Sequence, residues 1–208
     1  MPSPVSSRSC WPVACQDTAW RAPRHLQARD IQQGAHGLQF VVQEGDASQT
    51  LDTALIGHYN INNLLGVMAV LRAQGHPLAD AARACQHLPA VPGRMQAAND
   101  ATAAPAPWVV VDYAHTPDAV SQVLHTLRPL AAARQGALVC VVGCGGDRDP
   151  GKRAHMARAA EQHADRLVFT SDNPRSESPQ AIVDAMLAGL SQPDRADVEL
   201  DRARAIAL

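Results

Sequence analysis

The 208-residue chain has few aromatic side chains, little net charge and no long apolar run. Phe, Trp and Tyr make up 3% of the residues, so Ala, Val and Leu must fill most of a hydrophobic core. The formal net charge is −2 and the basic residues are scattered, which argues against nucleic acid or a membrane surface as a partner. A helix that spans a bilayer needs about 20 consecutive apolar residues, and we expect none.

The cysteines indicate neither a disulfide framework nor a metal site. Their number is odd and their spacing irregular: Cys10, Cys15, Cys85, Cys140 and Cys144. No second pair of ligands follows Cys140 and Cys144, whereas a closed zinc site needs four ligands, so we predict no metal site. Residues 1–25 lack the apolar core of a signal peptide and are expected to be irregular or disordered. These features are typical of a reduced, cytoplasmic protein.

The first half of the chain predicts two kinds of secondary structure and then a linker. Glycines between short apolar runs in residues 26–56 favour antiparallel strands and hairpin turns. An apolar stripe predicts a helix over residues 60–75, followed by a second short helix over 78–88. Small residues and prolines fill residues 99–107, which we interpret as a linker between a domain over 26–98 and one over 108–208.

Residues 108–208 predict an α/β domain of Rossmann-like type with a mostly parallel sheet. The strands are expected to be continuous apolar runs, which is typical of a parallel sheet buried on both faces. Right-handed crossovers would place the strand ends at Asp112, Gly143 and Thr170 on one edge, where ligands bind in such folds. Three polar loops should therefore converge there. The expected strands are 108–112, 137–142, 166–170 and 197–200, with helices over 117–130, 151–163 and from Ser178–Pro179 onward.

The loop after the second of these strands partly matches a phosphate-binding motif. Gly146, Gly151 and Lys152 have the spacing of a P-loop, but the next residue is Arg153 rather than the Ser or Thr that binds magnesium. The loop also contains aspartates, which repel phosphate. We therefore interpret it as an amino-acid site, in which Arg148 binds a carboxylate and an aspartate takes an ammonium group or orders the arginine. A solvated turn is the alternative.

The loop after the third strand has complementary chemistry. Asn173 offers a donor and an acceptor, Pro174 stiffens the loop, and Arg175 offers a rigid fork of donors. Asp172 precedes them. Asp-Asn-Pro is also ordinary turn chemistry, so the position of the motif after a strand carries the interpretation. Together with Arg148, this loop suits a zwitterionic amino acid.

Residues upstream suit a nucleotide, each with a structural alternative. Asp112, at a strand end, could bind a ribose hydroxyl or a metal, and His115 could act as a base or be structural, while Thr116 is suited to cap the following helix. Asn60 and Asn63 lie one turn apart, where they could read a purine edge, although Asn60 could equally cap its helix.

Five motifs occur in a specific order and spacing, and together they resemble the Mur ligase family. The resemblance covers roughly residues 26–208 and is closest to members that add meso-diaminopimelate to the peptidoglycan stem peptide. The motifs are G57HYNINNLLGVMAVL, V91PGRMQ, V109VVDYAHTPDAV, V141VGCGGDRDPGKR and S171DNPRSESPQAI.

The resemblance implies domains and site residues. Residues 26–98 would be the end of a central ATPase domain, and 108–208 most of a C-terminal domain that receives the amino acid. It implies no catalytic side chain in this chain. The residues implied to bind diaminopimelate are Arg148, Asp172, Asn173, Pro174 and Arg175, and those implied to face the nucleotide are Asn60, Asn63, Arg94, Asp112 and His115.

The implied reaction uses ATP and Mg²⁺ to join diaminopimelate to UDP-MurNAc-L-Ala-D-Glu through an acyl phosphate, in a monomer. The family's P-loop is absent from this sequence, so we expect an internal fragment without ligase activity. Three alternatives remain open: a ligase like folylpolyglutamate synthetase, a non-catalytic amino-acid-binding module, and a generic nucleotide-binding Rossmann domain. The last lacks its glycine-rich turn after the first strand.

Overall fold

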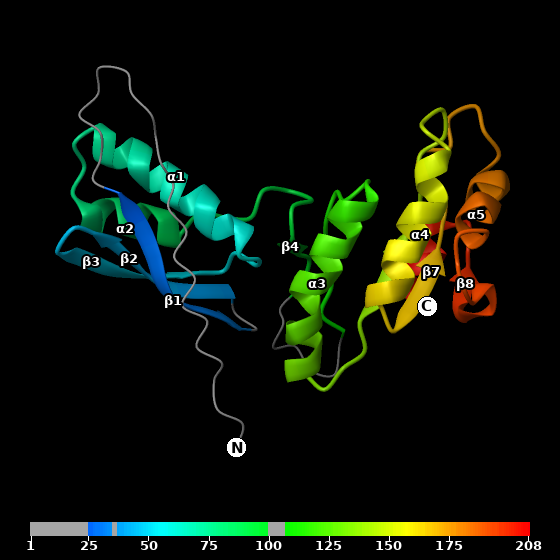
Figure 1. Ribbon diagram of the computed structural model, residues 1–208, viewed down its shortest axis with the longest axis horizontal. Helices are drawn as coiled ribbons and strands as arrows, with labels where there is room; N and C mark the ends of the chain where they lie inside the picture. The colour runs from blue at the N-terminus through cyan, green and yellow to red at the C-terminus, as the bar shows by residue number, and fades with distance from the viewer. Residues whose placement is uncertain (1–24, 35–36, 100–106) are drawn as a thin grey trace. The chain divides into compact units, whose positions relative to one another are not determined.

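The computed structural model describes residues 25–34, 37–99 and 107–208. The chain forms two compact units, Met1–Asp112 and Tyr113–Leu208, which we call unit 1 and unit 2. The predicted irregular start and most of the predicted linker lie outside the described residues. Both units mix helices and strands, as expected from the sequence (Figure 1). No helix in these described ranges has the length and apolarity that a bilayer crossing requires.

Unit 1 begins with an antiparallel sheet in the order β1-β2-β3, which confirms the predicted hairpins. Alternation along β2 directs Leu38, Phe40 and Val42 into the core, where none of their surface is exposed. The hairpin between β2 and β3 turns at Gly45, whose φ of 58° favours glycine. The strands are β1 (Leu26–Gly34), β2 (Gly37–Glu44) and β3 (Ala47–Thr53).

Two helices, α1 (Tyr59–Ala73) and α2 (Leu78–Gln86), pack against this sheet (Figure 1). The predicted stripe is confirmed: Ile61, Leu64, Leu65 and Met68 of α1 are buried in the same core as the sheet. Both predicted helices therefore form. Packing of the apolar stripe against the sheet stabilises α1, because a short helix gains most of its stability from burial of its apolar face.

The first strand expected in the parallel sheet does not join it. Only Val110–Val111 forms a strand, β5, and it pairs antiparallel with β4 (Gln96–Ala97) of the same unit. The exposed fractions of Val109 and Val111 are 38% and 45%, so this valine run is not buried on both faces. An apolar run satisfies its backbone with whichever strand is adjacent, and here β4 supplies the partner. The prediction of a four-stranded parallel sheet was therefore wrong.

Unit 2 contains a parallel sheet in the order β6-β7-β8, packed with helices. α4 packs between α3 and α5, and β7 is the buried central strand (Figure 1). The core joins Val120 and Leu124 of α3, Met156 of α4, Phe169 of β7 and Val183 of α5. The elements are α3 (Pro117–Ala133), β6 (Val139–Val142), α4 (Gly151–His163), β7 (Arg166–Phe169), α5 (Pro179–Leu187), η1 (Pro193–Arg195), β8 (Ala196–Val198) and α6 (Arg202–Ala207).

Local signals set where the helices of unit 2 begin. Thr116 caps α3 as predicted, since its side chain accepts a hydrogen bond from the backbone N–H of Ala119 at 3.2 Å. α5 begins at Pro179 as predicted, but Ser178 makes no side-chain capping bond. The parallel register aligns Val142 with Phe169, so β6 and β7 end together. The loops that follow these two strands therefore leave the same edge of the sheet.

Candidate functional site

The two loops that follow β6 and β7 are interlocked through their backbones. The N–H of Gly146 donates to the carbonyl oxygen of Asn173 at 3.1 Å. The guanidinium of Arg175 donates back to the carbonyl oxygen of Gly146. A Cβ at Gly146 would overlap the carbonyl oxygen of Pro174, so only glycine allows this approach. The predicted convergence is therefore observed for these two loops, whereas the third expected loop follows β5, which belongs to a different sheet.

Asp147 in the first loop bonds to both Ser176 and Glu177 in the second. Asp147 accepts bonds from the Oγ of Ser176 at 2.6 Å and from its N–H at 3.3 Å. In return, Oε1 of Glu177 accepts the N–H of Asp147 at 2.6 Å and Nη2 of Arg153 at 2.7 Å. We call Asp147, Arg153, Ser176 and Glu177 the latch. It joins both loops to α4, because Arg153 lies in the first turn of that helix.

The latch perturbs its own ionisable groups. The hydroxyl of Ser176 lowers the pKa of Asp147, and the hydrogen bond from Arg153 lowers the pKa of Glu177. Arg153 is only 4% exposed, and its bond to Glu177 raises the pKa of the guanidinium. All three groups therefore stay charged at neutral pH.

The structure places the predicted amino-acid ligands around this interlocked pair. A Cβ at Gly145 would lie 3.1 Å from Nη1 of Arg175 and 3.8 Å from Cγ of Arg148, so both arginines flank the same glycine. Arg148 is exposed and has no polar partner among the described residues. Asp172 accepts a bond from Nδ2 of Asn173 at 3.1 Å. Asn173 and Arg175, on either side of Pro174, have φ values of 45° and 51°.

Two left-handed non-glycine residues in one loop need support from the surroundings, since such conformations are disfavoured. The latch provides that support, and sequence reasoning missed it. The sequence predicts an aspartate of this loop as a ligand for an ammonium group or as a partner of the arginine, and it gives Arg153 only as a departure from the P-loop. The sequence contains only two weak indications of the latch: Arg153 where a P-loop has Ser or Thr, and Glu177 two residues after Arg175. Neither spacing shows that the two side chains meet.

Asp112 orients the turn that carries Arg94. Its Oδ2 accepts the backbone N–H of Met95 at 2.9 Å. Met95 is 1% exposed and has a φ of 45°, so this turn is both buried and held. Arg94 itself is exposed. Burial, with a smaller contribution from Asp112, raises the pKa of the neighbouring Tyr59 to about 12. Asp112, Arg94 and Tyr59 thus form one polar group in unit 1.

The two predicted asparagines bond to each other. Nδ2 of Asn63 donates to Oδ1 of Asn60 at 3.0 Å, and Nδ2 of Asn60 donates to the carbonyl oxygen of Ile56 at 2.8 Å. Asn60 therefore does not cap α1: the N-cap is His58, and Asn60 lies inside the first turn. The capping interpretation was wrong because this side chain bonds backward to Ile56. Asn63 remains exposed at the helix surface.

His115 lies in unit 2, whereas the other predicted nucleotide-facing residues lie in unit 1. Its Nδ1 is 3.0 Å from the carbonyl oxygen of Tyr113, and the two rings make an edge contact with centroids 5.5 Å apart. A carbonyl only accepts, so Nδ1 donates and Nε2 is the free acceptor of the neutral ring. Nζ of Lys152 donates to the carbonyl oxygen of His115 at 3.3 Å, which ties this loop to α4.

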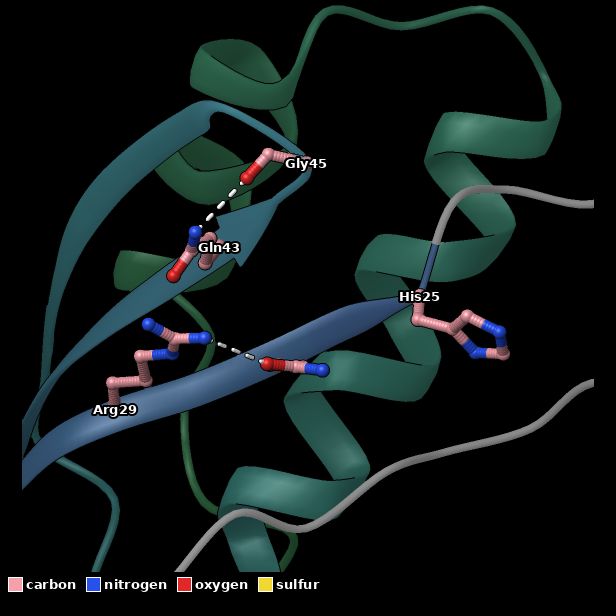
Figure 2. A pocket seen from close by; sticks show the side chains of 5 residues that line it. His25, Arg29, Gln43 and Gly45 are labelled. Carbon is pink, nitrogen blue, oxygen red and sulfur yellow. Dashed lines mark hydrogen bonds between the residues drawn. The ribbon is translucent and has the colours of Figure 1, made fainter. Parts of the chain in front are cut away.

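The remaining candidate sites carry little chemistry. Within the described ranges, no group of three His, Cys, Asp or Glu side chains could hold a metal ion. A hollow of about 390 Å³ lies on β1 and β2 of unit 1 (Figure 2). Its side chains include Arg29, which bonds to Gln27 at 3.2 Å, and Gln43, which bonds to the carbonyl oxygen of Gly45 at 2.9 Å. None of the predicted site residues lines it, and His25 points away from Arg29 and Gln43 (Figure 2).

Known proteins resemble most of this chain. The profile of the family described as "Mur ligase, glutamate ligase domain" matches residues 93–208. The UDP-N-acetylmuramoyl-L-alanyl-D-glutamate–2,6-diaminopimelate ligase of Acidovorax sp. (strain JS42) is 48% identical over 97% of this chain and 39% of its own length. The ligase of the same name from Janthinobacterium sp. (strain Marseille) is 45% identical over 87% of this chain and 35% of its own length.

Solved structures extend the comparison. A ligase with the same name aligns with a TM-score of 0.60 at 36% identity, over 87% of this chain and 36% of its own. A folylpolyglutamate synthase of Mycobacterium tuberculosis, complexed with ADP and AMPPCP, aligns with a TM-score of 0.66 at 24% identity, over 86% of this chain and 39% of its own, which shows a shared fold. The chain thus spans well under half of each relative. The family profile covers more than half of the chain, and the chain belongs to the Mur ligase family.

Proposed function

We propose that this chain is the part of an ATP-dependent ligase that receives meso-diaminopimelate and joins it to UDP-MurNAc-L-Ala-D-Glu in peptidoglycan synthesis. The observation that carries the proposal is the interlocked pair of loops, with Arg148 and Arg175 flanking Gly145. The names of the most similar relatives support the same substrate pair. The reaction takes place in the cytoplasm, and the protein acts as a monomer.

The two arginines bind the distal carboxylate of the amino acid. All the guanidinium N–H groups of Arg148 are available to a ligand. Arg175 donates one N–H group to the carbonyl oxygen of Gly146 and has the others available. Asp147 is less suited to the ammonium group, since each of its oxygens already accepts a hydrogen bond from Ser176. That role falls to Asp172, of which one oxygen is bonded to Asn173.

Binding in this way contributes proximity and selectivity. A fixed distal end directs the reacting amine of diaminopimelate toward the activated γ-carboxylate of D-Glu. Lysine lacks the distal carboxylate, so a site built to pair with that group rejects it strongly, because the arginines are then left unpaired.

Bound ATP would activate the γ-carboxylate of D-Glu, and the nucleotide would face residues of unit 1. Arg94 suits phosphate oxygens, since it is exposed on a turn that Asp112 holds. Asp112 therefore orients Arg94 and leaves its second oxygen for a hydroxyl. Asn63 can read a purine edge more readily than Asn60, because the side-chain oxygen and nitrogen of Asn60 are both already bonded. The described residues offer no cluster for Mg²⁺, so we assign no residue to that ion.

Calorimetric titration of the chain with meso-diaminopimelate and with lysine tests this proposal. We expect heat from diaminopimelate only, and its loss in Arg175→Ala and Arg148→Ala. Arg158→Ala is the matched control, since Arg158 lies exposed on α4 of the same unit. Equal, negligible heats for both amino acids would refute the proposal, and heat with glutamate alone would instead favour a function like that of folylpolyglutamate synthase.

A further inference from the structure

We propose that the ion pair between the buried Arg153 and the half-buried Glu177 is a positioning device that sets the affinity and selectivity of the diaminopimelate loop. The inference rests on the proposed function. Neither residue touches the amino acid; both act through the backbone that carries Asn173 and Arg175.

The geometry forms a closed ring of contacts. Arg153 donates to Glu177 at 2.7 Å, Glu177 accepts the N–H of Asp147 at 2.6 Å, and Asp147 accepts Ser176 at 2.6 Å. Ser176 precedes Glu177 in the chain, which closes the ring. Arg175 is attached directly to this ring and cannot leave its left-handed conformation, with a φ of 51°, without breaking it.

The ring also sets the distance between the two ligand arginines. Arg148 follows Asp147 in the first loop, and Arg175 precedes Ser176 in the second. Because Asp147 bonds to Ser176 through both its oxygens, the two arginines are held on one side of Gly145. A carboxylate that needs both guanidinium groups therefore depends on the latch.

Arg153 is a poor choice for stability alone. It is 4% exposed, and its Nε has no hydrogen-bond partner within the described part of the chain. A buried ion pair can often be replaced by apolar side chains of similar size without loss of stability, and an unsatisfied buried donor is an added cost. A charged group at this position is therefore better explained by what it holds than by how much it stabilises the fold.

The test compares the wild-type chain with Arg153→Met, which fills the same volume without charge. We expect Arg153→Met to stay folded, to bind meso-diaminopimelate about tenfold more weakly, and to discriminate less against lysine. Glu177→Ala removes the other partner of the ion pair, whose side chain is one-third exposed. This variant replaces Arg153→Met in the test if Arg153→Met does not fold. Glu177→Gln keeps an acceptor and should restore part of the affinity.

Glu161→Gln is the matched control. Glu161 also lies on α4 and also accepts backbone N–H groups, those of Ser191 and Gln192 at 3.0–3.1 Å, but outside the two loops. We expect this variant to bind diaminopimelate as the wild type does. Wild-type affinity and selectivity in both folded Arg153→Met and Glu177→Ala would overturn the inference.

Amide hydrogen exchange separates this inference from the proposed function. Loss of the latch should accelerate exchange at the N–H groups of Gly146 and Asp147, and Glu161→Gln should not. If the wild-type chain binds no diaminopimelate, the proposed function fails, and unchanged exchange in Arg153→Met would separately show that the pair holds no loop.

Discussion

The carboxylate of Asp112 holds the backbone of Met95, with Oδ2 accepting its N–H at 2.9 Å. These residues lie 17 positions apart, and β4 and β5 pair between them. Asp112, which the sequence predicts to bind a ribose hydroxyl or a metal, therefore also maintains the turn of Arg94.

Replacing Asp112 should destabilise unit 1. We expect Asp112→Ala to lower the free energy of unfolding by about 1 kcal/mol, because a half-buried N–H loses a charged acceptor. Urea denaturation measures the change. Asp52→Ala, at an exposed position of β3, is the control and should have little effect. Equal midpoints for the two variants would contradict a holding role for Asp112.

A methyl group at Gly146 should separate the two loops. Its Cβ would overlap the carbonyl oxygen of Pro174, and the backbones must move apart, at a cost of about 1–3 kcal/mol. Gly66→Ala is the matched control, since a Cβ there meets nothing within 4 Å outside the helix itself. It should be neutral or stabilise α1 by up to about 1 kcal/mol. Thermal denaturation distinguishes the two, and a Gly146→Ala variant as stable as Gly66→Ala would show that the loops can separate freely.

The ion pair between Arg72 and Glu44 should contribute more than an exposed one. It joins α1 to β2 at 2.8 Å, and Glu44 is 7% exposed. Arg72→Met leaves that carboxylate without its partner, which should cost about 2 kcal/mol. Arg83→Met removes a pair whose side chains are 70% and 50% exposed, and should cost under about 0.5 kcal/mol. Recovery of stability in the double variant with Glu44→Gln would support the account, and similar losses in both single variants would contradict it.

Acid should loosen unit 2 through its paired carboxylates. The hydrogen bond from Arg128 lowers the pKa of Asp165, and the N–H of Ser191 lowers that of Glu161. Since the folded pKa lies below the unfolded one, the unfolded chain binds more protons. This stability is therefore full above the ordinary carboxyl range and is lost as the pH falls through the lowered folded values.

The amide signals of Leu138 and Ser191 report this titration by NMR, since both groups donate to these carboxylates. We expect the chemical shifts of these amides to change at a pH below the usual carboxyl pKa. The double variant Asp165→Asn with Glu161→Gln should make the stability of unit 2 depend less on pH in the acid range. Chemical-shift changes centred at the ordinary carboxyl pKa would contradict this prediction.

The sequence by itself determined the local elements and the order of the loops. The stripe of α1, the cap at Thr116 and the start of α5 at Pro179 depend on neighbouring residues, so periodicity and capping chemistry sufficed. The parallel pairing of β6 and β7 followed from the alternation of strand and helix. That alternation also placed Arg148 and Arg175 on one edge of the sheet.

Only the tertiary structure decided which groups met. It paired Val110–Val111 with Gln96–Ala97 instead of the parallel sheet, and it turned Asn60 toward Ile56 instead of the helix end. It also joined Arg153 to Glu177, 24 positions away. Hydrogen-bonding groups take partners by proximity in space, and a spacing along the chain carries no record of that proximity. The candidate ligands could therefore be read from the sequence, but the latch that holds them could not.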